Sequence, residues 1–336
     1  MRFAFTEDQV AFADAVRGLL RDQCTPDRVR AVWDGDEPYV RDVWEKLAGM
    51  GVVGLTAPAS AGGLGMGPLD WVLLFEEAGR VALPAPLVET TAVAIPLLAS
   101  LGESACVERA ASGDGIVAIT MADNVDRVAY GASADAVIVC TDDTVRLLGA
   151  GDFRVREVVP SVDHAWLLAA LDTDAAAGQV VAEGPEAADA IADAYDRGAL
   201  AAAAELCGLG EHLLAAAVEY ATHRKQFGVA IGTYQAIKHH LADVRIALSY
   251  ARPLVHAAAW HVAEHTPERS TYVSMAKAYA SDAAVLASKK ALQVHGAIGY
   301  TWEYDLQLWM KKAWALAVAW GDADFHRRRV ADAVLG

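Results

Sequence analysis

Two stretches decide the fold, RKQFG at Arg224–Gly228 and QVHGAIGY at Gln293–Tyr300. Each stands where a long run rich in alanine and leucine gives way to a loop. An arginine there can offer a planar, permanently charged fork to a phosphate group, and a glycine such as Gly296 lets a ligand approach the backbone closely. Taken singly, Arg224 also fits a solvated charge at a helix end, and Gly296 and Gly299 fit helix C-caps.

Long helices are predicted around both stretches. Small alanine faces let helices approach closely, and antiparallel helices of this length pack most simply as a bundle. From Pro185 onward the apolar pattern predicts these helices: Ala187–His223, Tyr234–Glu264, Thr271–His295 and Asp305–Val334.

The chain before Pro185 divides into a helical part and a β part. Thr6 and Gln9 have the spacing of a helix capping box, and apolar residues follow at helical intervals. Further helices are predicted at Val40–Met50, Leu69–Val81 and Leu87–Leu101. Short β-branched runs then predict strands of a small β region at Ile116–Thr120, Ala136–Cys140 and Val145–Leu148.

Composition limits the function classes. A length of 336 residues suggests two domains or one large multi-layer unit, and the net charge of −16 argues against a nucleic-acid partner. The apolar stretch Ala313–Trp320 is too short to span a membrane, and the acidic N-terminus does not fit a signal peptide. The four cysteines lie far apart, so we expect reduced thiols and a cytoplasmic protein without membrane insertion.

With a glutamine at Gln235, seven residues past Gly228, the two stretches resemble the acyl-CoA dehydrogenase family. LAGMGVVGL at 47–55, GGLG at 62–65 and EEAGR at 76–80 add to the likeness, which covers about the first hundred residues and nearly all of Arg197–Leu335. The resemblance implies a mainly α protein with a small β domain. Its parts would be an N-terminal α-helical domain (1–112), a reduced middle β domain (113–184) and a C-terminal four-helix bundle (185–336), assembled as dimers or tetramers.

The same resemblance implies FAD as cofactor and an acyl-CoA thioester as substrate. In the reaction a carboxylate removes the α proton while the β hydrogen passes as hydride to the flavin, and an electron-transfer flavoprotein or similar protein accepts the electrons. The bundle motifs of the family bind the FAD of a neighbouring subunit. Arg224 would contact the pyrophosphate, with Gln226 and Phe227 beside it. The adenosine and diphosphate end would be lined by Gln235, Gln293, Gly296 and Ala297.

The sequence departs from the family at the catalytic base. An ungapped register puts Trp320 where the family usually has a glutamate, and Gly198 at the alternative position; neither can accept a proton. Glu205 would lie about 10 Å further along its helix. Asp322 and Asp196 are close in sequence to the two positions and remain weak alternatives.

The β region also departs from the family. Residues 121–127 and 137–148 replace the Thr-Glu-Pro-Gly and Trp-Ile-Thr-Asn segments that cover the flavin ring. The chain thus keeps the residues that would contact a neighbour's FAD but lacks the base and the segments that would cover its own flavin. This combination is typical of the non-catalytic subunit of an α2β2 acyl-CoA dehydrogenase whose partner is a longer paralogue. Such enzymes act in bacterial steroid degradation, so we expect a bulky, steroid-derived acyl chain. Two alternatives stay open: a self-sufficient homo-oligomeric dehydrogenase with an unidentified base, and a non-catalytic assembly subunit.

Two further patterns are set aside. HVAEH at His261–His265 matches an inverted zinc-protease motif, but the helix ends at Pro267 and leaves little structure for a third ligand, so no metal is expected. The glycines of Gly62–Gly67 lack the spacing of a dinucleotide-binding loop and predict a turn.

Overall fold

The computed structural model describes residues 4–121, 125–174 and 177–336. It divides into two compact units that alternate along the chain. The first unit contains Met1–Arg30, Val72–Leu83 and Ala199–Gly336, and the second contains Ala31–Trp71 and Pro84–Gly198. The division into three domains at residues 112 and 184 stays a prediction.

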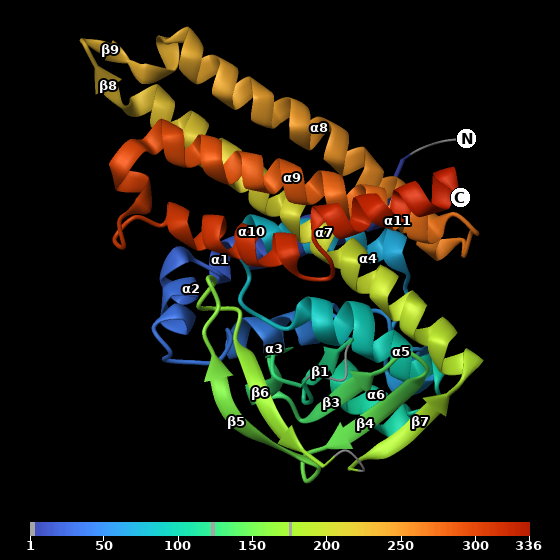
Figure 1. The fold of residues 1–336 in the computed structure, drawn as a ribbon. Helices are drawn as coiled ribbons and strands as arrows, with labels where there is room; N and C mark the ends of the chain where they lie inside the picture. Colours follow the sequence, from blue (N-terminus) through green and yellow to red (C-terminus); the bar gives the residue numbers. More distant parts are fainter. Residues whose placement is uncertain (1–3, 122–124, 175–176) are drawn as a thin grey trace. The chain divides into compact units, whose positions relative to one another are not determined.

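The first unit is helical. Its long helices are α8 (Gln235–Ala263), α9 (Arg269–His295) and most of α7 (Pro185–His223), and α8 and α9 run side by side in Figure 1. α7 is long and apolar enough to cross a membrane, but 72% of its apolar window is buried, which is typical of a core helix. It also contains α1 (Glu7–Gln23), where Thr6 and Gln9 form the expected capping box through bonds of 2.9 and 3.2 Å.

The single helix expected at Asp305–Val334 is wrong. The chain forms α10 (Leu306–Val318) and α11 (Ala323–Leu335) with a turn between them. Trp320 and Gly321 both have positive φ, which stops α10. The Asp322 carboxylate then caps α11 by accepting a hydrogen bond from the Phe325 amide at 2.7 Å.

Helix α4 (Pro68–Arg80) meets α7 in backbone contact. A Cβ atom on Gly208 would lie 1.9 Å from the Glu76 carbonyl oxygen, and one on Gly79 would lie 2.1 Å from the Glu205 carbonyl oxygen. Only glycine permits this approach. The buried Glu76 carboxylate on α4 accepts hydrogen bonds from Arg252 of α8 at 2.8 Å and from His256 at 2.7 Å.

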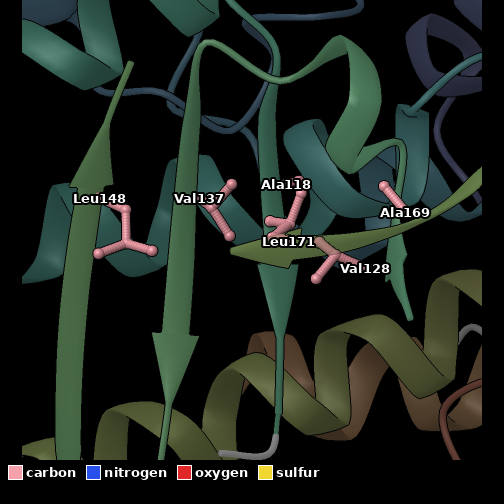
Figure 2. Close-up of a cluster of buried hydrophobic side chains, with 6 residues drawn as sticks. All are labelled: Ala118, Val128, Val137, Leu148, Ala169 and Leu171. Atoms are coloured by element: carbon pink, nitrogen blue, oxygen red, sulfur yellow. The ribbon is translucent and has the colours of Figure 1, made fainter. Parts of the chain in front are cut away.

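The second unit combines short helices with two small sheets. One sheet has the order β1-β3-β4-β7, with β1 parallel to β3, and the other has the antiparallel order β2-β6-β5. Their facing sides form a core of Ala118, Val128, Val137, Leu148, Ala169 and Leu171 (Figure 2). The strands are β1 (Val117–Thr120), β2 (Val128–Ala129), β3 (Ala136–Cys140), β4 (Thr144–Gly149), β5 (Phe153–Val159), β6 (Leu168–Thr173) and β7 (Gln179–Glu183).

One predicted helix of the second unit differs from the structure in its winding, and several short helical segments were not predicted. The segment expected as one helix at Leu87–Leu101 begins as a π-helix, η2 (Leu87–Ala94), and continues as α5 (Ile95–Ser100). Pro96 has no amide hydrogen to continue the α-helical ladder, which accounts for a change in winding here. The other helical segments are α2 (Pro26–Trp33, which begins in the first unit's part of the chain), α3 (Arg41–Gly49), η1 (Ala59–Ala61), α6 (Ser104–Ala111) and η3 (Gly131–Ser133).

Candidate functional site

One end of the helical unit gathers the residues singled out from the sequence. We call residues 220–240 and 290–304 the hairpin end. The ring of Tyr220, near the end of α7, stacks on His295 at the end of α9 with 4.3 Å between centroids. Lys290 of α9 lies 2.8 Å from His240 of α8. The end of α7, the start of α8 and the end of α9 therefore meet at one place.

A two-residue hairpin projects from this end (Figure 1). It consists of β8 (Lys225–Gln226) and β9 (Val229–Ala230), joined by Phe227 and Gly228 at φ values of +51° and +84°. Positive φ at both central residues is the type I′ turn that matches the twist of a hairpin. The Phe227 side chain is 94% exposed at the tip, and the Tyr234 hydroxyl donates to the Gln226 carbonyl at 3.2 Å. The hairpin therefore presents an aromatic ring to solvent.

The structure brings all the predicted cofactor-binding residues to the hairpin end. Every one of them is exposed, so none is occupied in packing this chain's own core. They are Arg224, Gln226, Phe227, Gln235, Gln293, Gly296 and Ala297.

The hairpin end has the chemistry of a site for a phosphate-bearing aromatic ligand. In a chain with a net charge of −16, this end exposes the cations Arg224, Lys225 and Lys238. Gly296 has φ +68° and ψ −148°, and a Cβ there would meet nothing within 4 Å, so its backbone faces open space. An exposed guanidinium, open glycine backbone and the bare ring of Phe227 fit a dinucleotide.

Sequence reasoning missed a buried aromatic cluster under this surface. His295 is 5% exposed and lies between the rings of Tyr220 and Tyr304, at 4.3 and 5.2 Å. Its Nδ1 lies 2.8 Å from the Ala291 carbonyl oxygen, and burial lowers the pKa of its imidazole. The neutral ring supports the turn that begins at Gly296. Its place inside the QVHG motif was the available signal.

The two positions aligned with the family base hold no carboxylate. Trp320 lies in the α10–α11 turn, where its carbonyl accepts a hydrogen bond from His326 at 2.8 Å. Gly198 is buried within α7 of the second unit. Of the weak alternatives, Asp322 uses its carboxylate to cap α11 and Asp196 is fully buried. The structure brings neither aspartate to the hairpin end.

The other sequence patterns have structural roles or lie partly outside the described residues. His261 stacks on Tyr272 at 3.6 Å and its Nδ1 lies 2.7 Å from the Thr266 hydroxyl, which stabilises the turn after α8. Among the residues described, no group of three His, Cys, Asp or Glu side chains is arranged to hold a metal. The segment 121–127, which replaces a flavin-covering loop, includes 122–124, which lie outside the described residues.

Family models and a related protein both connect this chain with acyl-CoA dehydrogenases. Models described as the N-terminal and C-terminal domains of acyl-CoA dehydrogenase match residues 6–111 and 188–335. The acyl-CoA dehydrogenase IpdE2 of Mycolicibacterium smegmatis is 31% identical over 329 residues, covering 97% of this chain and 98% of that protein.

Two solved structures are similar over the whole chain. The ChsE4-ChsE5 complex of Mycobacterium tuberculosis has a TM-score of 0.87 at 25% identity, covering 100% of this chain and 99% of that chain. The butyryl-CoA dehydrogenase of Megasphaera elsdenii has a TM-score of 0.89 at 22% identity, with 100% of both chains covered.

Proposed function

Because the chain belongs to the acyl-CoA dehydrogenase family, we propose that it is one subunit of an FAD-dependent dehydrogenase that oxidises an acyl-CoA thioester between its α and β carbons. Its hairpin end completes the FAD site of a catalytic partner subunit. One observation carries the proposal: the residues that match the family's FAD contacts are all exposed, whereas the positions of the family base hold Trp320 and Gly198.

Charge supports a dinucleotide at the hairpin end. A pyrophosphate carries negative charge that this acidic chain would repel unless local cations offset it. Arg224 supplies a permanent charge in fork geometry, with Lys225 beside it, and the open backbone at Gly296 admits a close approach. Phe227 offers a fully exposed face for stacking on a ring system.

The missing base supports a division of labour between two different chains. Bound FAD supplies the hydride acceptor, and the α proton must still be removed by a group within hydrogen-bond reach. The Trp320 indole has only a donor N–H and Gly198 has no side chain, so neither can take that proton. The base therefore comes from the partner, which we propose to be a longer acyl-CoA dehydrogenase paralogue in an α2β2 complex.

Similarity to a heteromeric protein supports the same arrangement. The ChsE4-ChsE5 structure is a complex of two differently named chains, and this chain matches it over its whole length. Within this proposal the substrate is a bulky, steroid-derived acyl-CoA, because a degenerate half-site leaves room that a second complete site would fill. The complex would work in the cytoplasm and pass electrons to an electron-transfer flavoprotein or similar acceptor.

Flavin retention tests the proposal. The chain is purified alone and after co-expression with a longer acyl-CoA dehydrogenase paralogue from the same organism, and flavin absorbance is compared. We expect little flavin with the chain alone and a yellow, active complex. Arg224→Ala should weaken FAD binding by the complex by about 1.5–3 kcal/mol, or roughly 10- to 150-fold in Kd. Arg328→Ala, which removes an exposed arginine of α11, is the matched control and should leave the Kd unchanged.

The same experiment separates the alternatives. Stoichiometric FAD and acyl-CoA turnover by the chain alone would establish a self-sufficient homo-oligomer and overturn the proposal. Full flavin binding by a complex carrying Arg224→Ala would instead favour an assembly subunit. A panel of short-chain, long-chain and steroid-derived acyl-CoA substrates tests the substrate class.

A further inference from the structure

Strand β5 is the outermost strand of its sheet, and its outer edge is unpaired. The sheet has the order β2-β6-β5, so β5 pairs with β6 on one side only (Figure 1). In the part of the chain that the structure describes, the backbone of residues 153–159 bonds to no segment other than β6. A free edge of seven residues is long enough to pair with a strand of another molecule.

The core side of β5 carries apolar side chains that stay half-exposed. Side chains directly opposite each other in an antiparallel pair lie on the same face of the sheet. Val155 is opposite Leu171 and Val158 is opposite Ala169, and both β6 residues belong to the buried core of Figure 2. Val155 and Val158 are nevertheless 42% and 53% exposed. The core face therefore continues past the edge of the sheet, where a further strand would cover both valines.

The other side of β5 carries two free charges of opposite sign. Arg154 is opposite Asp172 and Glu157 is opposite Ala170, which alternate with the core residues of β6, so both charges lie on the face away from the core. Both are exposed, and among the described residues neither has an ion pair or a side-chain hydrogen bond. Charges on an edge strand discourage pairing with a copy only where like charges meet.

A β-bulge makes β5 complementary to itself. The bulge at Arg156 shifts the register between β5 and β6 by one residue. Arg154 and Glu157 are therefore opposite alternate residues of β6, so their N–H and C=O groups point the same way, and the same holds for Phe153 and Val158. Opposite residues of an antiparallel pair must match in this way. A second β5 strand meets the condition when its Glu157 lies opposite Arg154, and its Val158 then lies opposite Phe153.

We propose that two copies of this chain pair through their β5 strands, antiparallel about a two-fold axis, with Arg154 of each copy beside Glu157 of the other. Two-fold symmetry makes each contact occur twice. The pairing thus forms two ion pairs on the outer face and two contacts between Phe153 and Val158 on the core face. The pairing uses residues of the second unit alone, so it does not depend on the hairpin end or on the proposed FAD site.

Sedimentation equilibrium of the whole chain measures this pairing. We expect a reversible monomer–dimer equilibrium at concentrations up to about 100 µM, well above the Kd of a micromolar interface. Arg154→Glu sets like charges opposite each other at two places and should raise the dimer Kd about tenfold or more. Glu157→Arg should have the same effect. The double variant Arg154→Glu/Glu157→Arg restores opposite charges and should return the Kd to near the wild-type value.

Two further measurements make the test specific. Arg127→Glu makes the same change of charge just before β2, at the opposite edge of the sheet, and should leave the Kd unchanged. Disulfide formation tests the register: an Arg154→Cys chain mixed with a Glu157→Cys chain should cross-link on mild oxidation. The Arg154→Cys chain alone should not, because its two cysteines would be offset by three residues, about 10 Å along the strands.

A chain that stays monomeric at about 100 µM overturns the proposal. So does a dimer whose Kd is the same in the wild type and in Arg154→Glu, or one that the double variant fails to restore. Should a charge variant fail to fold, hydrogen exchange of Phe153–Val159 in the wild type decides. Protection that rises with protein concentration supports the pairing. Protection that is independent of concentration, or that appears only when a longer paralogue is added, overturns it, and the latter assigns the edge to a strand of that partner.

Discussion

Replacing Gly208 with alanine should destabilise the helical unit more than replacing Gly210, the other α7 glycine that faces a neighbouring helix. The added Cβ would sit 1.9 Å from the Glu76 carbonyl oxygen and 2.9 Å from the Arg80 amide nitrogen, both backbone atoms of α4. An ordinary contact begins near 3.4 Å, so α4 and α7 must separate by about 1.5 Å where no side chain can move aside.

The magnitude follows from three contributions. Overpacking against backbone costs about 3 kcal/mol. Moving α4 also lengthens the bonds from Arg252 and His256 to the buried Glu76 carboxylate, which costs about 1 kcal/mol more. Alanine recovers about 1 kcal/mol through its higher helix propensity. We therefore expect Gly208→Ala to lower the free energy of unfolding by about 3 kcal/mol.

Urea unfolding followed by far-ultraviolet circular dichroism measures this loss. Two other glycines are matched controls. At Gly210 the new Cβ would meet the flexible end of Leu248 at 2.6 Å, so we expect a smaller loss. At Gly18 of α1 it would meet nothing within 4 Å, so alanine should stabilise by up to about 1 kcal/mol. A free energy of unfolding for Gly208→Ala within about 0.5 kcal/mol of the wild type would refute the reasoning.

Two further predictions concern pH and the hairpin. His326 is fully buried, and burial lowers the pKa of its imidazole to about 4 from the ordinary 6.5. As pH falls, the unfolded chain therefore takes up a proton at His326 before the folded chain does. About 3 kcal/mol of stability should be lost as pH falls from 6.5 to 4. Urea unfolding at pH 7 and pH 4.5 should show most of this loss in the wild type and less of it in His326→Gln. Phe227→Asn should raise the melting temperature of the chain. Asn-Gly suits a type I′ turn, so the substitution should relieve about 1 kcal/mol of left-handed strain at residue 227. An unchanged or lower melting temperature would contradict this prediction.

The fold could be predicted wherever local sequence and packing agree. The spacing of Thr6 and Gln9 specifies a capping box by itself, and the boundaries of α7 and α9 lie within two residues of the prediction. The break between α10 and α11 was missed, although Gly321 followed by Asp322 is a sequence signal for the end of one helix and the start of the next. The positive φ at Trp320 has no such signal, because tryptophan does not favour it. That turn is set by Lys277 and His326, which bond to it from elsewhere in the fold.

For the candidate site, too, the sequence predicts which residues take part but not how the fold presents them. The resemblance to the family predicts that Arg224, Gln226 and Gly296 contact FAD, but the sequence cannot tell whether they face the chain's own interior or another molecule. Their exposure answers this for the single chain. An isolated subunit gains nothing by holding Phe227 strained and 94% exposed at a hairpin tip. Such a residue makes sense where a ligand or partner covers it, so the strain favours a shared site over a degenerate one that has lost its function.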